Sequence, residues 1–228
     1  MLVELVTATT TDGLDLDGAL YLPPGNPRSP APEILLVHGL DWNFYRGYSR
    51  WLPPLLAGGG YPCLSLNMRD HDLREPKDFE LAHHDLRAGI DFLFKRGARE
   101  VVLVSHGFSC NKVVCYQALS NDSRVRRSVL TTLGAVKAYR PDIWKEVLDR
   151  APSMQGEALL IQGTADPEIE PHERAKELVA VAKSVRFEVE FMDANHHFDG
   201  RHQELASSVL RWLDRSPKSV SAESLSAR

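Results

Sequence analysis

The stretch that decides the fold is Val101–Cys115, VVLVSHGFSCNKVVC. Its first four residues, 101–104, are apolar and mostly β-branched, so they predict a short buried strand. Ser105 then opens a tight turn, and the residues from Phe108 onward suit a helix. Ser105 and Ser109 are small, as close contact between a strand and the following helix requires. The stretch therefore predicts a strand that runs through a sharp turn directly into a helix.

A strand, a sharp turn and a helix form the frame of the nucleophile elbow, G-x-S-x-G, in which the central residue is held in strained geometry at the top of a sheet. On that frame residues 105–109 read Ser-His-Gly-Phe-Ser, with Gly107 at the position of the nucleophile. The stretch resembles the elbow of the α/β-hydrolase superfamily, and the pieces described below extend the resemblance over roughly residues 10–213.

The resemblance implies an α/β-hydrolase fold: a mostly parallel central sheet of about eight strands, helices on both faces and a minimal lid. It implies a single domain over residues 1–214. The serine-rich residues 215–228 show no apolar periodicity and are expected to form a disordered tail.

Gly107 leaves more than one interpretation open. Glycine has no side chain to attack a carbonyl, so an acyl-enzyme cannot form at this position. Glycine also fits the turn, because an elbow residue tends to have positive φ, where glycine is unstrained. The chain is therefore an enzyme that works without the serine, a protein that has given up catalysis, or a serine esterase whose nucleophile has been replaced by glycine.

Composition excludes several classes of function. The chain of 228 residues has a net charge of −4, with 25% charged and 43% hydrophobic residues, as expected of a globular domain. No cluster of Lys and Arg indicates a nucleic-acid partner, and no apolar run approaches the ~20 residues that span a membrane. The opening MLVELVTATTTDG does not resemble a secretory signal, and the three cysteines lack metal-finger spacing. These features predict a cytoplasmic protein.

The first part of the chain supplies the second landmark of the resemblance. Leu2–Thr9 and Leu14–Leu22 flank a Thr-Asp-Gly turn and predict an antiparallel hairpin. The strand Glu33–Val37 then runs directly into His38-Gly39. In the superfamily this loop supplies one backbone N–H of the oxyanion hole, and the residue after the nucleophile supplies the other. By position, the resemblance assigns these N–H groups to Leu40, with Asp41 as an alternative, and to Phe108.

Side chains near the two loops are expected to contact substrate. This set is His38, Asp41, Trp42, Tyr45 and His106. For Trp42, Phe44 and Tyr45, ordinary core packing is an equally open interpretation. Cys110 stands one helical turn after Gly107, but we interpret it as a packing residue, because a reactive thiol needs an accessible, electropositive setting.

The remaining elements alternate between strands and helices. Further strands are expected at Pro62–Asn67, Ser128–Leu133, Ala158–Gln162 and Arg186–Met192, and helices at Tyr48–Ala57, Asp78–Arg96, Phe108–Leu119, Pro141–Asp149, Glu173–Lys183 and Glu204–Leu213. Between the strands ending at Leu133 and beginning at Ala158 the chain has room for one helix, which is why the lid is expected to be minimal.

Two members of the superfamily's catalytic triad are present in its chain order. Asp166 follows the penultimate strand, where the resemblance places the triad acid. His196 follows the last strand in the loop Asp193–Gly200, where it places the catalytic histidine, and the neighbouring His197 is the weaker candidate. Three histidines, His196, His197 and His202, lie close in sequence, but the triad order explains His196. We therefore expect neither a metal site nor a cofactor.

A His–Asp pair beside an oxyanion hole is an acid/base site even without serine. His196 could activate water to hydrolyse an ester, thioester or acyl group of a small carbonyl substrate. It could instead move a proton, as in a lyase or cyclase. The alternative from a different class is a non-catalytic protein that binds a small ligand or a protein partner. The sequence does not distinguish these functions, and it gives no oligomeric state.

Overall fold

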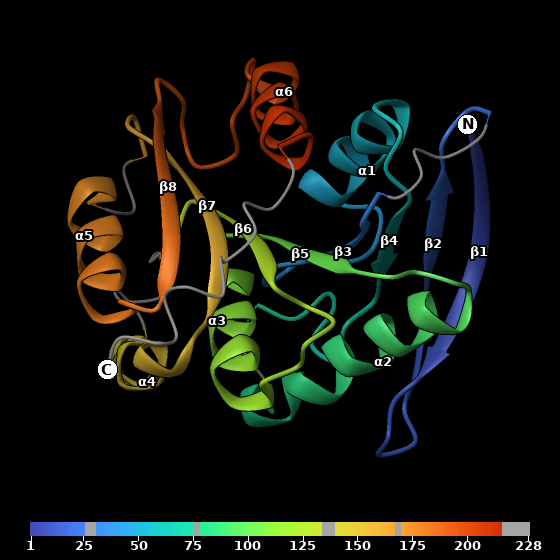
Figure 1. Ribbon diagram of the computed structural model, residues 1–228, viewed down its shortest axis with the longest axis horizontal. Helices are drawn as coiled ribbons and strands as arrows, with labels where there is room; N and C mark the ends of the chain where they lie inside the picture. Colours follow the sequence, from blue (N-terminus) through green and yellow to red (C-terminus); the bar gives the residue numbers. More distant parts are fainter. Residues whose placement is uncertain (26–30, 75–77, 134–139, 167–169, 216–228) are drawn as a thin grey trace, which may run out of the picture.

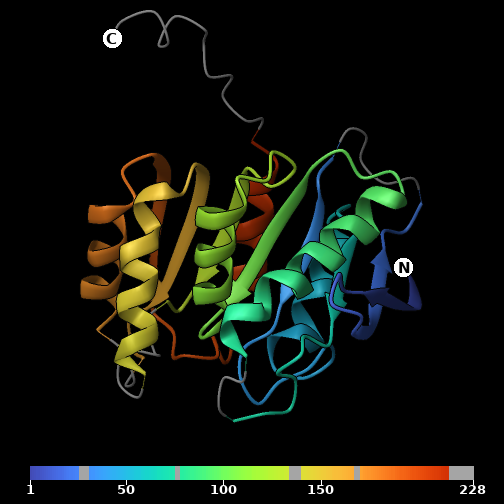
Figure 2. The same cartoon turned by 90° about the horizontal axis from the view of Figure 1, so that it is seen from below.

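An eight-stranded sheet lies between two layers of helices (Figures 1 and 2). The computed structural model describes residues 1–25, 31–74, 78–133, 140–166 and 170–215. The strand order is β1-β2-β4-β3-β5-β6-β7-β8, and every pair from β4 to β8 is parallel. The strands are β1 (Leu2–Thr9), β2 (Asp15–Leu22), β3 (Glu33–Val37), β4 (Cys63–Leu66), β5 (Val101–His106), β6 (Arg127–Thr131), β7 (Gly156–Gly163) and β8 (Val185–Met192). The predicted fold class is confirmed.

Helices cover both faces of the sheet. On one face lie α1 (Tyr48–Gly58) and α6 (His202–Leu213), which contact each other. The other face carries α2 (Ala82–Lys95), α3 (Ser109–Ser120), α4 (Pro141–Arg150) and α5 (Pro171–Val181), seen side by side in Figure 2. Two short 3₁₀ turns, η1 (Phe79–Leu81) and η3 (Ala151–Ser153), precede α2 and follow α4.

The central strands are apolar throughout because both of their faces are covered. Successive side chains of a strand point to opposite faces. In β5, Val102 and Val104 accordingly pack with the cluster under α1 and α6, whereas Leu103 packs with the cluster under the other four helices. Strands β3 and β7 divide their residues in the same way.

The amino-terminal hairpin is confirmed. Strands β1 and β2 pair antiparallel from Leu2 opposite Leu22 to Thr9 opposite Asp15. Gly13 in the connecting turn has φ 86°, which glycine adopts without strain. β2 then pairs antiparallel with β4, so the hairpin extends the parallel sheet at one edge.

Several predicted boundaries differ from the structure by one or two residues and one by four, and for two of them the backbone gives the cause. The helix expected from Asp78 begins at Ala82, because Asp78 has φ 51° and η1 intervenes. The strand expected to reach Leu133 ends at Thr131, because Thr132 turns the chain with φ 49°. This early end leaves the hydroxyl groups of both threonines beside the candidate site described below.

The segment between β6 and β7 does not form a lid over the described residues. Helix α4 contacts α3 and α5 and lies in their layer (Figure 2). Its Trp144 is buried and donates a hydrogen bond from Nε1 to Glu177 Oε2 (2.7 Å). The one helix expected between these strands is therefore present, and it lies in the layer that covers the sheet. Residues 134–139 lie outside the described residues.

Arg215 is the last residue that the structure describes. Arg215, placed in the expected tail, bonds Glu188 on β8 at 2.5 Å. The rest of that tail, 216–228, lies outside the described residues. Among the helices that the structure describes, none has the length and apolar character needed to cross a membrane.

A buried ion pair joins α3 to the loop after β4. Lys112 Nζ lies 2.6 Å from Asp70 Oδ1, and the two side chains are 1% and 2% exposed. Lys112 also lies over the ring of Phe108, 5.8 Å from its centroid. This pair fixes the first turns of α3, and therefore the elbow, against the neighbouring loop.

Breaking this ion pair should destabilise the fold strongly. We expect Lys112→Met to lower the free energy of unfolding by about 3–5 kcal/mol, because Asp70 is left as an uncompensated buried charge. The double variant Lys112→Met/Asp70→Asn should recover most of that loss. Urea unfolding followed by circular dichroism measures both. The control Lys145→Met removes an exposed pair with Asp149 and should cost no more than about 1 kcal/mol. An equal loss of stability in Lys112→Met and Lys145→Met would contradict the stabilising role of the buried pair.

Candidate functional site

The candidate site lies where the parallel strands end. Gly107, Asp166 and His196 follow β5, β7 and β8 respectively. Carboxyl ends of parallel strands meet at one edge of a sheet, which is where open α/β sheets bind their ligands. The three predicted residues therefore arrive at the same edge from segments that are distant in sequence.

The turn at Gly107 has the geometry of an elbow. Gly107 has φ 58°, and its N–H donates to Thr131 O (2.8 Å) at the end of the neighbouring strand. Ser109 closes the turn, since its Oγ donates to His106 O and accepts from His106 N–H, both at 2.9 Å. A Cβ added to Gly107 would lie 3.2 Å from Nε2 of His196 and would meet no other neighbour as closely. The first side-chain atom of any residue at this position would thus face the histidine.

The predicted histidine and aspartate are in contact. His196 Nδ1 lies 2.6 Å from Asp166 Oδ2, and the Asp166 side chain is fully buried. Because a carboxylate accepts hydrogen bonds, Nδ1 carries a proton, and in the neutral imidazole it is Nε2 that has the lone pair. The lone pair of His196 is therefore directed to the side of the ring that faces Gly107.

Close packing of two loops makes this contact possible. Thr164 N–H donates to Met192 O (2.8 Å), and Ala165 N–H donates to Ala194 O (3.0 Å). A Cβ on Gly163 would lie only 2.5 Å from Ala194 O, so glycine at the end of β7 permits this approach. This role of Gly163 was not predicted, although a glycine at the end of a strand is a signal for close backbone approach.

His106 brings a second imidazole to the site. Its Nδ1 lies 2.9 Å from Thr131 Oγ1 and 3.2 Å from Thr132 Oγ1. Its ring stacks on Trp42 (5.2 Å between centroids) and meets the ring of His196 edge-on (5.1 Å). Burial, reinforced by the nearby His196 and His197, holds the pKa of His106 well below its ordinary value. His106 is therefore neutral and belongs to the wall of the site.

Three histidines meet at the site, and they are not the three that lie close in sequence. One ring nitrogen each from His106, His196 and His197 lies within 4.8 Å of the other two. His202 instead stacks on Trp51 at 3.9 Å, away from this cluster. Phe198 anchors the loop, because its side chain is fully buried and touches His106 with ring centroids 6.1 Å apart.

His38 does not fit its predicted contact with substrate. The ring is fully buried, with Nδ1 at 2.8 Å from Gly39 O and Nε2 accepting from Met68 N–H at 2.8 Å. Burial lowers the pKa of His38 from 6.5 to about 4. Both ring nitrogens are used to hold the loop after β3 against the loop after β4. His38 is a structural residue.

The other predicted contacts have mixed placements. Trp42 lies at the site, between Tyr48, His106 and His197. Tyr45 is 54% exposed and packs on Phe44. Asp41 is half-buried with φ 59°, and its N–H donates to Leu73 O (2.6 Å), which removes it as an oxyanion donor.

The predicted oxyanion donors flank the elbow. A Cβ on Gly39 would lie 3.3 Å from His106 O and 3.9 Å from Phe108 N, so the His-Gly loop packs directly on the turn. Phe108 has helical φ and ψ and precedes α3. Within the described residues, the N–H groups of Leu40 and Phe108 have no backbone acceptor.

The alternative nucleophile is inert. Cys110 is fully buried, and its Sγ lies 3.3 Å from Thr131 O and 3.4 Å from Ser105 Oγ. Burial raises the pKa of this thiol to about 12. The interpretation of Cys110 as a packing residue therefore agrees with its surroundings.

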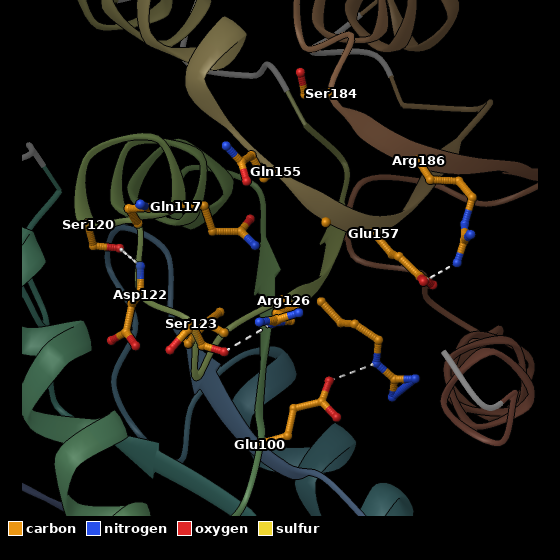
Figure 3. Close-up of a pocket in the computed structure, with 14 residues that line it drawn as sticks. Glu100, Gln117, Ser120, Asp122, Ser123, Arg126, Gln155, Glu157, Ser184 and Arg186 are labelled. Atoms are coloured by element: carbon orange, nitrogen blue, oxygen red, sulfur yellow. Dashed lines mark hydrogen bonds and ion pairs between the residues drawn. The ribbon is translucent and has the colours of Figure 1, made fainter. Parts of the chain in front are cut away.

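A cavity of about 930 Å³ lies at the opposite edge of the sheet (Figure 3). Its lining includes Glu100, Arg127, Glu157 and Arg186, which lie at or next to the amino ends of β5 to β8. Arg127 pairs with Glu100 at 3.2 Å, and Arg186 pairs with Glu157. Charge is balanced within this cavity, and the His–Asp contact is at the other edge, so we place the candidate site at the carboxyl ends.

No protein-family model matches the sequence, and no curated protein matches it significantly. Solved structures resemble it closely in fold. The Pyrococcus furiosus esterase Pf2001 superposes with a TM-score of 0.72 at 18% identity over 95% of this chain and 92% of its own. Est1E from Butyrivibrio proteoclasticus with ferulic acid bound gives 0.75 at 15% identity over 91% and 97%. Dienelactone hydrolase from Anabaena variabilis gives 0.69 at 20% identity over 92% and 96%.

These similarities show that the chain has the α/β-hydrolase fold, as the elbow and the His-Gly loop predict. At such low identity they show the fold alone. The chemistry must therefore be argued from the site itself.

Acid should weaken the fold through His38. Above pH 6.5 the His38 ring is neutral in both the folded and the unfolded state. Below pH 6.5 the ring is protonated in the unfolded state, whereas in the folded state it stays neutral down to about pH 4. Stability should therefore fall as pH falls from 6.5 to 4, by about 3 kcal/mol from this group. Urea unfolding at pH 7.5 and pH 4.5 should show a smaller pH dependence in His38→Gln than in the parent. The exposed control His83→Gln should keep the parent's dependence, and identical behaviour of the two variants would contradict this account.

Proposed function

We propose that this protein hydrolyses a small ester, thioester or activated acyl compound without a covalent serine step. In this mechanism His196 is the general base, Asp166 orients it, and a water molecule takes the place of the serine hydroxyl. The observation that carries the proposal is the position of His196: Nδ1 is held by Asp166 at 2.6 Å, while Nε2 lies 3.2 Å from where a side chain at position 107 would begin.

The proton movements follow from this arrangement. Water beside Gly107 gives a proton to Nε2 of His196 as its oxygen attacks the carbonyl carbon. The tetrahedral oxyanion accepts hydrogen bonds from the N–H groups of Leu40 and Phe108. The imidazolium, stabilised by Asp166, then returns the proton to the departing oxygen or sulfur. The C–O or C–S bond breaks, and the acid and the alcohol or thiol leave.

The magnitudes allow catalysis without serine. Oxyanion donors and positioning alone leave about 10³–10⁴-fold acceleration over water when members of a triad are removed. A positioned general base adds about 10²–10⁴-fold. These factors suit a substrate that is already reactive, such as an activated ester or a strained lactone.

The structural neighbours support the same substrate class. One is described as an esterase, one holds ferulic acid and one is described as a dienelactone hydrolase. An ester or lactone of modest size is therefore the first substrate to test. Trp42 and the neutral ring of His106 give the proposed pocket an aromatic wall that suits an unsaturated acyl group.

Two other functions would use the same residues differently. As a lyase or cyclase, the protein would take a proton from a carbon atom of the substrate with His196. As a binding protein, it would hold a ligand without turnover. Hydrolysis alone transfers an oxygen atom from solvent to the product, so labelling with ¹⁸O-water separates it from both.

Removal of the proposed base should abolish turnover. We expect His196→Ala to lower kcat on p-nitrophenyl acetate or a small enol lactone by about 10²–10⁴-fold, because water then has no proton acceptor. Asp166→Asn should fall in the same range, since an amide no longer favours the required tautomer. Initial rates measure both effects.

The matched control is His202→Ala, which removes a histidine from the same end of the domain but outside the site. It should retain the parent's rate. If His196→Ala turns over as fast as this control, or if the parent shows no turnover above buffer on these substrates, the hydrolase proposal is wrong.

Restoring the nucleophile should create a covalent mechanism. We expect Gly107→Ser to release a burst of p-nitrophenol from short p-nitrophenyl esters, because its hydroxyl would stand beside His196. The new Cβ lies 3.2 Å from Nε2, so the ring must shift by a few tenths of an ångström. The positive φ should cost about 1 kcal/mol of stability.

Gly107→Ala is the control for this experiment, because it introduces the same backbone strain without a nucleophile. Stopped-flow absorbance measures the burst, and mass spectrometry of the intact Gly107→Ser chain detects the bound acyl group as an added mass. A folded Gly107→Ser protein no faster than Gly107→Ala would show that the elbow is misplaced.

A further inference from the structure

The three imidazoles at the site form a cluster that the proposed hydrolysis does not fully use. His106, His196 and His197 come from two separate segments, and one ring nitrogen of each lies within 4.8 Å of the others. They differ in exposure: His106 is buried, His196 is half-buried and His197 is exposed. One ring of the cluster is therefore held inside the protein, and another is accessible from solvent.

The surrounding hydrogen bonds favour one tautomer of His106. Thr131 Oγ1 donates its proton to Ser105 O (3.0 Å), and Thr132 Oγ1 donates its proton to Thr131 O (2.8 Å). With their protons used in this way, both hydroxyl groups accept from the ring, an arrangement that favours the proton on Nδ1 of His106 and a lone pair on Nε2, which lies 3.4 Å from Thr132 Oγ1.

His196 has the same arrangement with a stronger partner. Asp166 accepts from Nδ1 at 2.6 Å and leaves Nε2 as the lone-pair nitrogen. Metal-binding histidines almost always donate their other ring N–H to a carboxylate or another oxygen, which fixes the tautomer and raises the basicity of the ligand. Two of the three rings thus already have the outer hydrogen bonds that a metal site requires.

Glycine at position 107 leaves the approach to Nε2 open. A zinc ion bound to imidazole lies about 2.0–2.1 Å from the nitrogen. A Cβ at position 107 would lie 3.2 Å from Nε2 of His196, within the space that such an ion and its water would occupy. Any side chain larger than glycine would therefore crowd an ion at this nitrogen.

We propose that His106, His196 and His197 together bind one divalent transition-metal ion, with Zn²⁺ as the best-matched ion. Three imidazole ligands suit Zn²⁺ better than Mg²⁺ or Ca²⁺, which prefer oxygen ligands. Tetrahedral geometry needs nitrogens about 3.4 Å apart. The exposed ring of His197 closes on the other two, and a water molecule completes the coordination.

Metal binding and the proposed base compete for the same lone pair. This consequence rests on the proposed function: while a metal ion occupies Nε2, His196 cannot accept a proton from water. The ion therefore inhibits the hydrolysis in which His196 is the general base, and a chelator should restore that rate.

Direct binding measurements test the site without reference to turnover. The metal-free full chain is titrated with Zn²⁺ in competition with a chromophoric chelator, and with Co²⁺ while the visible spectrum is recorded. We expect one ion per chain and the intense visible absorption of tetrahedral Co²⁺. Failure to bind one equivalent of Zn²⁺, or a weak octahedral Co²⁺ spectrum, would overturn the proposal.

Variants assign the ligands. His197→Ala is on the surface and should fold, and it should weaken Zn²⁺ binding by about 100-fold or more, beyond the 10–100-fold typical of losing an outer-shell partner. Asp166→Asn should weaken it by about 10–100-fold, and Gly107→Ala should weaken it by obstruction. The control His202→Ala should bind as the parent does. Equal affinity in His197→Ala and His202→Ala would refute the site.

The activity arm keeps the two proposals separate. If the parent hydrolyses esters, stoichiometric Zn²⁺ should suppress the rate and a chelator should restore it, whereas His197→Ala should need about 100-fold more Zn²⁺ for the same suppression. Zn²⁺ binding with the expected ligand pattern in a protein without turnover would support the metal site while refuting the hydrolase. A rate raised by stoichiometric Zn²⁺ would overturn the inhibitory role.

Discussion

The hydrogen bond between His196 and Asp166 is the constraint on which the site depends, because it joins two loops that the sheet alone would not hold in register. Each loop follows a different parallel strand, and both must turn inward for the 2.6 Å contact to form. Gly163 permits that turn, since any side chain there would strike the backbone at Ala194. The absence of a side chain at Gly163 thus allows the Asp166 carboxylate to reach the imidazole of His196.

The sequence predicted the parts of the structure that depend on order along the chain. The hairpin, the parallel sheet and the sequence Gly107, Asp166, His196 all follow from strand patterns and from what comes directly after each strand.

Prediction failed where the role of a side chain depends on how deeply it is buried. His38 and Tyr45 stand in similar loop positions, yet one is locked to backbone beneath the site and the other is largely solvated. Neither the hydrophobic periodicity of the sequence nor the His-Gly motif indicates which of the two side chains is buried. The roles of Thr131 and Thr132 were equally hidden, because a two-residue error in the end of β6 concealed their contact with His106.

Glycine at position 107 fits the turn after β5 and, in the proposed mechanism, leaves room for water there. The left-handed turn at Gly107 is retained with φ 58°, and glycine accommodates it with less strain than serine would. The helix that follows still presents Phe108 N–H beside the packed His-Gly loop. The position at the turn therefore faces the imidazole of His196 with no side chain between them. The buried pair of Lys112 and Asp70 holds the start of α3 in place whether or not a nucleophile is present.

That space gives a single lone pair two competing uses. A base needs Nε2 of His196 to be unprotonated, partly shielded and close to a small oxygen species. A metal ligand needs the same lone pair, the same carboxylate behind it and the same room in front. The two uses differ in whether they need His106. The hydroxyl groups of Thr131 and Thr132 donate to carbonyl oxygens and accept from Nδ1 of His106. His106 therefore offers a further neutral nitrogen, which proton transfer to water does not require. If the site only deprotonated water, an apolar side chain at position 106 would work as well as histidine. Burying an imidazole there costs free energy, which only its hydrogen bonds or a bound ligand can offset.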